Sequence, residues 1–179
     1  MSKNVILSEI KKGKIFKIGD VEFIKFFDEN GETVAITKDL IFFSRFGNNN
    51  DLRNSDILKR LNEEFLPKLA EAIGEENICT IKTDLTTIDG LKPYETMESK
   101  VSLPTLDFYR ANVAIFDEYK VDNWWWLATP ESAQPHSAPD WIFCVAPSGY
   151  VRHSGNFYSS GGVRPFLRFV SSIYVSCED

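Results

Sequence analysis

The sequence has few of the residues that most often build catalytic or metal-binding sites. It contains only two histidines, His136 and His153, and three widely spaced cysteines in 179 residues. It has no Cys-x-x-Cys or His-x-x-x-His spacing for a metal and no Gly-x-Ser-x-Gly motif for a serine nucleophile. Because an odd number of distant cysteines does not suggest a disulfide framework, we expect reduced thiols. Without a catalytic set, we expect a protein that is not an enzyme.

Long hydrophobic runs and an excess of basic residues are also missing. No segment approaches the ~20 apolar residues of a membrane-spanning helix. Residues 1–12 alternate apolar and charged side chains instead of forming a signal sequence. We therefore expect a cytoplasmic protein without a membrane partner. The net charge of −6 argues against direct nucleic-acid binding through phosphate neutralisation and permits a basic protein partner.

The chain does have many aromatic residues, above all in its C-terminal half. Trp124, Trp125 and Trp126 are consecutive, and Trp141 follows them. Each such side chain can remove ~150–250 Å² from water, so the fold should close over most of them. Because side chains alternate between the faces of a strand, we expect two of the three consecutive rings in the core and at least one pointing the other way. We assign structural roles to Trp125 and Trp141 and a binding role to Trp124.

Arg164 lies in the Gly-Gly-Val-Arg-Pro segment of residues 161–165. We expect its side chain to be buried or half-buried and to donate several hydrogen bonds to loop carbonyls or a carboxylate. The guanidinium group suits this role because it presents several donors in a fixed plane. An anion-binding role is the alternative.

Local patterns predict an α+β fold built around twisted antiparallel sheets. Residues 14–37 have the alternation of an antiparallel β-meander, with a two-residue hairpin turn at Asn30-Gly31. We expect one domain over residues 1–179, in which this meander packs with a core formed by residues 113–175.

Two helices are expected between these parts. Apolar residues at helical spacing predict one main helix over about residues 55–73, with Asn54 or Ser55 as its N-cap and Gly74 after its end. Pro67 should end or kink this helix and restart a shorter one. Thr105 can cap a short second helix over about residues 105–112.

Two polar loops near the C-terminus are candidate binding surfaces. Residues 129–140 contain three prolines and little to bury, and residues 156–160 form a second polar tip. A plain connector with solvated carboxylates is the alternative for the first loop. The predicted binding residues are Trp124, Glu131, His136, Asp140, Phe157 and Tyr158.

A zinc site that includes Cys144 and His153 is one option. If Cys144 pairs with Val151 across a hairpin, Cys144 and His153 become diagonal neighbours on one face. With Cys177 or His136 as a further ligand, they could bind zinc. The alternatives are no cofactor at all and Cys144 as a small buried hydrophobic residue.

The C-terminal motifs resemble those of a known domain family. They are the Trp-Trp-Trp-Leu-Ala-Thr-Pro run of residues 124–130, the Ser-Gly-Tyr-Val turn of residues 148–151 and the Gly-Gly-Val-Arg-Pro-Phe-Leu segment of residues 161–167. From about residue 14 to residue 170, the chain is similar to a domain family of unknown function encoded mostly by Firmicutes, their phages and other mobile elements. This resemblance implies a C-type-lectin-like fold, similar to formylglycine-generating-enzyme-like domains and phage tropism determinants, and implies no reaction.

Two departures limit what the resemblance carries over. Ala128 stands where the family usually has arginine, and Phe166 where a small residue is common. The formylglycine-generating relatives depend on a cysteine pair, and no two cysteines of this chain are close together in the sequence of the C-terminal core. That activity is therefore not carried over.

Three functions remain as hypotheses. The leading one is a non-enzymatic, monomeric protein-binding module from a phage or mobile element. Its most specific form is an inhibitor of a bacterial defence system, of the anti-CRISPR type, that binds a host protein such as a CRISPR effector nuclease. The alternatives are a receptor- or carbohydrate-binding lectin-like module and a metal-dependent enzyme related to formylglycine-generating proteins.

Overall fold

The computed structural model describes residues 2–156 and 160–178 as a mixed α+β structure with three mostly antiparallel sheets and one main helix. The six-stranded sheet has the order β1 (Ser2–Ile6), β13 (Tyr174–Glu178), β2 (Ile15–Ile18), β3 (Val21–Glu29), β4 (Glu32–Thr37) and β12 (Phe166–Val170). The five-stranded sheet has the order β10 (Val151–Gly155), β9 (Trp141–Val145), β8 (Trp125–Pro130), β11 (Gly161–Val163) and β5 (Phe42–Ser44). A hairpin of β6 (Ile81–Asp84) and β7 (Thr96–Ser99) forms the third sheet.

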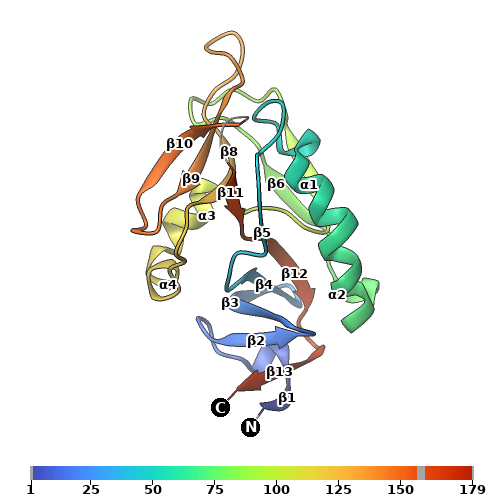
Figure 1. Cartoon of the computed structure of the whole chain (residues 1–179). Coiled ribbons are helices and arrows are strands. Elements are labelled where there is room, and N and C mark those ends of the chain that lie inside the picture. The colour runs from blue at the N-terminus through green and yellow to red at the C-terminus, as the bar shows by residue number, and fades with distance from the viewer. Residues whose placement is uncertain (1, 157–159, 179) are drawn as a thin grey trace.

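The six-stranded sheet lies at the end of the molecule that carries both termini (Figure 1). Its strands β2, β3 and β4 form the meander expected for residues 14–37. The second turn of the meander has φ of 52° at Asn30 and 78° at Gly31, the left-handed conformation that a tight two-residue hairpin needs. The strands β12 and β13 pair with β4 and β2. The meander therefore shares one hydrogen-bonded sheet with the C-terminal part of the chain.

The main helix runs without a break over the range expected from the sequence, through α1 (Asp56–Arg60), a π-helical turn (Leu61–Phe65) and α2 (Leu66–Ile73). The side chain of Ser55 caps it by accepting a hydrogen bond from the backbone N–H of Leu58 at 2.9 Å. Pro67 does not end the helix, but the α-helical pattern is interrupted near Glu64 and α2 begins again with Pro67 in its first turn. A wide π turn just before Pro67 accommodates a residue that has no N–H and whose ring would collide with an ordinary preceding turn.

The second helix begins as expected and is followed by another helix that the sequence analysis missed. The Thr105 hydroxyl accepts from the backbone N–H of Phe108 at 3.1 Å and caps α3 (Leu106–Ala111). The missed helix is α4 (Val113–Glu118), a range for which no helix was predicted. Three short 3₁₀ helices complete the description: η1 (Leu7–Glu9), η2 (Leu52–Asn54) and η4 (Glu75–Asn77).

The five-stranded sheet separates two hydrophobic clusters. The helices α1 and α2 lie on one side of this sheet, and α3 and α4 lie on the other (Figure 1). Trp126 is fully buried in the cluster beneath the main helix, and Trp125 is buried in the cluster beneath α3 and α4. Two of the three consecutive tryptophans are therefore core residues on opposite faces, as the alternation of a strand predicts.

Trp124 is half-buried and packs edge-on against Trp126, with the ring centroids 4.7 Å apart. A Cβ atom at Gly161 would lie 2.5 Å from the Trp124 ring, so only glycine lets β11 approach β8 this closely. None of the helices in the described residues is long and apolar enough to cross a membrane.

Candidate functional site

Strands β9 and β10 present one face that is covered at one end and open at the other. Val145 and Trp125 are buried at the end that lies under α3 and α4. Phe143 is half-buried farther along. At the open end Trp141 is 43% exposed, and the side chain of His153 is 50% exposed. The open end therefore presents an aromatic and a titratable side chain on a rigid pair of strands.

The exposed residues of this face are joined to the end of β8. The Nδ1 atom of His153 lies 2.8 Å from Glu131 Oε2. The His153 ring also lies against the Trp141 ring, with centroids 5.0 Å apart. The backbone N–H of Glu131 donates to the carbonyl of Trp141 at 3.0 Å. Three strands thus fix the relative positions of Glu131, Trp141 and His153.

A second histidine–carboxylate pair connects two loops beside the first pair. Asp89 Oδ2 accepts from the hydroxyl of Ser132 at 2.6 Å and lies 2.8 Å from Nδ1 of His136. The hydroxyl of Thr87 donates to the other carboxylate oxygen. The hydrogen bonds from Ser132, Thr87 and His136 hold the pKa of Asp89 well below its usual range. Asp89 is therefore ionised at neutral pH and ties the loop of residues 85–95 to the loop of residues 131–140.

Serine, histidine and aspartate meet here without forming a nucleophilic triad. In a triad, histidine is placed between serine and the carboxylate and accepts the proton of the serine hydroxyl. Here Ser132 donates directly to Asp89, and His136 contacts the same carboxylate oxygen. The base therefore does not activate the hydroxyl, and the cluster is suited to binding and positioning.

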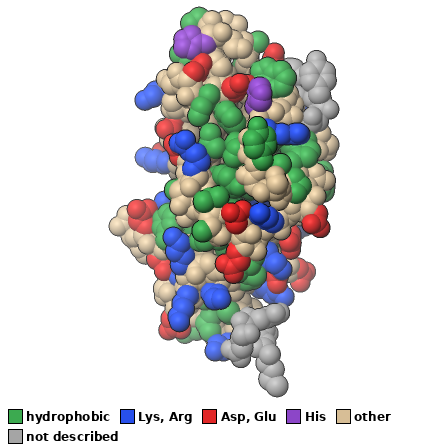
Figure 2. Space-filling view, turned by 90° about the vertical axis from the view of Figure 1, so that its left-hand side faces the viewer, with side chains coloured by type: hydrophobic (Ala, Val, Ile, Leu, Met, Phe, Trp, Pro, Cys, Tyr) green, Lys and Arg blue, Asp and Glu red, His purple; other side chains and the backbone are tan. Residues whose placement is uncertain are grey.

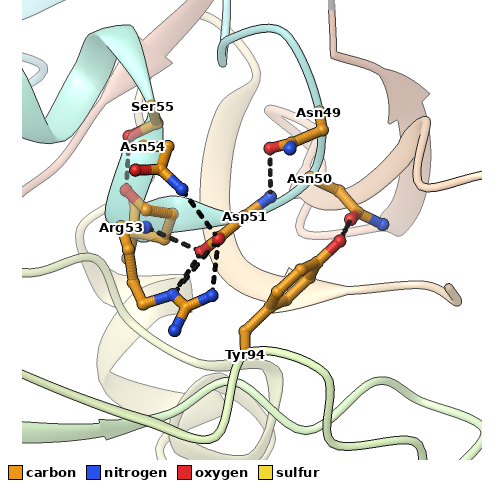
Figure 3. A network of polar contacts seen from close by, with 8 residues as sticks. Asn49, Asn50, Asp51, Arg53, Asn54, Ser55 and Tyr94 are labelled. Carbon is orange, nitrogen blue, oxygen red and sulfur yellow. Dashed lines mark hydrogen bonds and ion pairs between the residues drawn. The ribbon is translucent and has the colours of Figure 1, made fainter.

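A buried asparagine holds the base of both loops (Figure 3). The amide nitrogen of Asn50 donates to the carbonyls of Ser132 and Trp141, at 2.8 and 2.9 Å. Its amide oxygen accepts from the hydroxyl of Tyr94 at 2.6 Å. Since Asn50 is completely buried and these side-chain groups are paired, it fixes the positions of three chain segments.

The adjacent Asp51 stabilises the segment that carries Asn50. Its carboxylate accepts from the backbone N–H and the guanidinium of Arg53 and from the amide of Asn54. Its own backbone N–H donates to the side chain of Asn49 at 3.0 Å (Figure 3). The Asn-Asn-Asn run of residues 48–50 thus holds the two loops in place through Asn50, and Ser55 caps the helix.

We call Asp89, Glu131, His136, Trp141 and His153 the histidine–carboxylate surface. Figure 2 shows the two histidine side chains towards the upper end of this side of the molecule, with acidic and hydrophobic side chains beside them. Both carboxylates are partly exposed, each with 32% of its side chain accessible. The surface combines an aromatic anchor with two fixed hydrogen-bonding pairs.

The structure brings together some of the predicted binding residues and separates others. Glu131 and His136 both belong to the histidine–carboxylate surface, through His153 and Asp89 respectively. Trp124 belongs to the opposite face of the sheet, beside Trp126 and the guanidinium of Arg152. Asp140 is half-buried, and its carbonyl accepts from the backbone N–H of Asn156 at 3.0 Å. Phe157 and Tyr158 lie outside the described residues.

Trp141 does not have the buried side chain that its assigned structural role would require. It begins β9, and α3 and α4 cover only the far end of that face, so its ring is left 43% exposed. Its carbonyl does have a structural part, because it accepts from Asn50 and Glu131. The side chain is therefore better described as part of a surface.

The geometry expected for a zinc site was wrong by one residue of register. Val151 pairs with Val145, and Arg152 pairs with Cys144. Because a shift of one residue moves a side chain to the other face, Cys144 points into the core and His153 points outward. Among residues 2–156 and 160–178, no group of three or more histidine, cysteine or acidic residues could hold a metal ion.

Arg164 is buried and ties loop carbonyls together, as expected. Its guanidinium donates to the carbonyls of Thr37, Lys38 and Tyr119, at 2.9, 2.7 and 3.0 Å. It also lies over the rings of Phe116 and Trp125, about 5.5 Å from each. Burial lowers the pKa of Arg164 to about 10, so the group remains charged at neutral pH.

No protein-family model, curated protein or solved structure matches this chain.

Sequence reasoning missed three residues that build the surface. Neither Asp89 nor Asn50 was among the predicted site residues, and His153 was predicted only as a zinc ligand. Asp89 precedes Gly90, which has a φ of 88° in the turn that follows. Apart from Thr87, the side-chain partners of Asp89 and Asn50 lie about 45 to 90 residues away, so no local pattern indicates them.

The three cysteines are free thiols, and two of them are expected to react slowly. Burial raises the pKa of the Cys79 thiol to about 11 and also raises that of Cys144. Since the thiolate is the nucleophile, iodoacetamide at pH 8 should label both much more slowly in the folded protein than in guanidinium chloride. Peptide mass spectrometry would measure each rate. Rapid labelling of either thiol in the folded protein would show that it is activated after all.

Proposed function

We propose that this chain is a non-enzymatic protein-binding module whose contact site is the histidine–carboxylate surface, with Trp141 as its central anchor. The observation that carries the proposal is a partly exposed tryptophan on a rigid strand, in contact with His153 of one preorganised histidine–carboxylate pair, with a second such pair in the adjoining loop. Tryptophan is among the residues that most often dominate binding energy at protein interfaces. A fixed surface also loses little conformational entropy on binding.

The motif resemblance and the charge support a more specific form of this proposal. The chain has a C-type-lectin-like fold of a phage or mobile-element family, and it acts as a monomer in the bacterial cytoplasm. There it inhibits a defence system, in the manner of an anti-CRISPR protein, by binding an effector nuclease. The net charge of −6 favours association with a basic protein surface, such as one that normally binds nucleic acid.

Of the two other functions considered, only glycan binding retains a candidate surface. An exposed tryptophan flanked by carboxylates could also contact a sugar, although the His153 ring already lies 5.0 Å from the Trp141 ring. The metal-dependent enzyme loses its suggested site, because Cys144 and His153 lie on opposite faces of the hairpin.

Replacing Trp141 with alanine is expected to weaken partner binding by at least about tenfold, as for an interface hot spot. The tagged protein would be used to capture partners from a lysate of a Firmicute host with active CRISPR systems, with mass spectrometry of the retained proteins. The partner's affinity would then be measured for each variant. Tyr174→Ala is the matched control, because Tyr174 is 68% exposed on β13 in the other sheet.

A stoichiometric protein that binds the wild type and Tyr174→Ala, and binds Trp141→Ala weakly, supports the proposal. Circular dichroism would establish that the variants are folded. Equal affinity of the partner for all three proteins would place the contact site elsewhere. A glycan that binds at Trp141, with no protein retained, would favour the lectin-like alternative.

A further inference from the structure

A second site of different chemistry lies at the other end of the molecule. A cleft of about 830 Å³ is formed mainly by β1, β2, β13 and the segment after η1. This volume is within the range of sites that bind small molecules, ~300–1,000 Å³. The strands that line the cleft belong to the six-stranded sheet, whereas Trp141 and His153 belong to the five-stranded sheet. Figure 1 shows these two sheets towards different ends of the molecule.

The lining of the cleft is positively charged in an acidic protein. Five lysines and two glutamates line it, whereas the whole chain has a net charge of −6. Figure 2 shows several Lys or Arg side chains gathered near the lower end of the face in view. The lining lysines are Lys3, Lys11, Lys14, Lys17 and Lys38. Such a local reversal of sign concentrates anions at the cleft.

The two acidic residues of the lining, Glu9 and Glu22, cancel only part of this charge. Glu22 is shared by two lysines, at 2.6 Å from Lys38 and 3.3 Å from Lys17. The hydrogen bond from Lys38 lowers the pKa of Glu22, so this carboxylate stays ionised and offsets part of the charge of Lys17 and Lys38. Lys11 and Lys14 are exposed and form no ion pair with any residue of the described ranges. Their charges are available to a ligand.

The wall that carries Lys11 and Lys14 is fixed before any ligand binds. The backbone N–H of Lys14 donates to the carbonyl of Lys11 at 3.1 Å, closing a turn. Backbone bonds of Gly13 and Lys14 with Lys25 attach this turn to β3, at 2.8 and 3.0 Å. The buried ammonium of Lys25 donates to the carbonyls of Leu7 and Ser8 and holds η1 behind the wall. A preorganised site costs little to order on binding.

The floor of the cleft is apolar and aromatic. Val5, Ile10 and Ile15 contribute to the lining, as does Tyr119, whose hydroxyl donates to the carbonyl of Gly13 at 2.8 Å. Lysine ammonium groups act as point charges that suit phosphate oxygens. A ligand that matches both parts has several phosphate charges and an apolar or planar portion.

We propose that the cleft between β1, β2, β13 and the Lys11–Lys14 turn binds a small organic phosphate of nucleotide size. Lys11 and Lys14 contact the phosphates, and the apolar floor contacts the remainder of the ligand. This site is independent of the proposed protein-binding surface, because the two share no residue.

Calorimetric titration of the full-length protein with ATP, inorganic tripolyphosphate and adenosine, at low salt and without divalent metal, would test the proposal. ATP and tripolyphosphate are expected to bind saturably at one site, with affinity that falls as salt is added, and adenosine is expected to bind at least about tenfold more weakly than ATP. The double variant Lys11→Glu/Lys14→Glu should lose about tenfold or more in affinity for ATP.

The matched control is Lys59→Glu/Lys92→Glu, which changes the net charge equally at two exposed lysines outside the cleft. Both double variants change the net charge by the same amount, but the control leaves the cleft intact. Its affinity for ATP should therefore stay within about twofold of the wild-type value. Thermal melting would confirm that both variants fold. The proposal is overturned if neither phosphate binds saturably, if adenosine binds as tightly as ATP, or if the two double variants lose the same affinity.

Discussion

Replacing Arg164 with methionine is expected to lower the free energy of unfolding by about 3–5 kcal/mol. Methionine fills much of the same volume, so the main loss is the hydrogen bonding of the carbonyls of Thr37, Lys38 and Tyr119. Arg164 is only 1% exposed, so water has little access to replace these bonds. For a chain of this size, the melting temperature should fall by roughly 6–20 °C.

Arg168→Met is a suitable control for Arg164→Met. Arg168 pairs with Glu29 and Glu32 at 3.1 and 3.3 Å, with 26% of its side chain exposed. Its loss should cost less than about 1 kcal/mol, because partly exposed ion pairs contribute little. Chemical denaturation of both variants would compare the two values. Equal losses would show that the three carbonyl contacts of Arg164 do not stabilise the fold as argued.

Replacing Trp126 with alanine is expected to cost a similar ~3–5 kcal/mol, the usual range for a large aromatic removed from a core. Trp126 is completely buried, packs against Phe46 at a centroid distance of 5.6 Å and donates its indole N–H to the carbonyl of Ser44 at 2.9 Å. The substitution removes the packing and leaves that carbonyl without this donor. Trp125→Ala should fall in the same range, because Trp125 is 2% exposed.

Denaturant titration followed by circular dichroism would measure these losses. Tyr174→Ala, at a position 68% exposed, should change the free energy of unfolding by no more than about 0.5 kcal/mol. A loss below about 1 kcal/mol for Trp126→Ala would mean that the sheet does not pack on this ring.

The elements that were predicted correctly depend on signals between near neighbours. The hairpin at Asn30-Gly31, the Ser55 cap and the Thr105 cap each involve residues within a few positions of one another. The burial of Trp125 and Trp126 on opposite faces follows from the alternation of a strand. Such features depend on local backbone conformation and on hydrogen bonds between residues that are close in the sequence. The sequence therefore indicates them directly.

The errors arose where two segments had to be placed against each other. The hairpin of β9 and β10 could be predicted, but its register could not, because residues 146–150 connect the strands with a longer turn than the two-residue type that fixes register. Because of this one-residue difference in register, His153 lies on the surface beside Trp141 and not on the same face as Cys144. The helix α4 was missed because it has only six residues and no side-chain cap that would mark its start.

By itself, the sequence determined the α+β class, the meander, the extent of the main helix and the burial of two tryptophans. Only the tertiary structure decided that Asp89 meets His136, 47 positions away, that Arg164 reaches the carbonyl of Thr37, 127 positions away, and that five lysines line one cleft. The physical reason is that these contacts depend on how distant strands and loops are packed. Local propensity and alternation specify the elements, whereas the long-range packing of those elements creates both proposed sites.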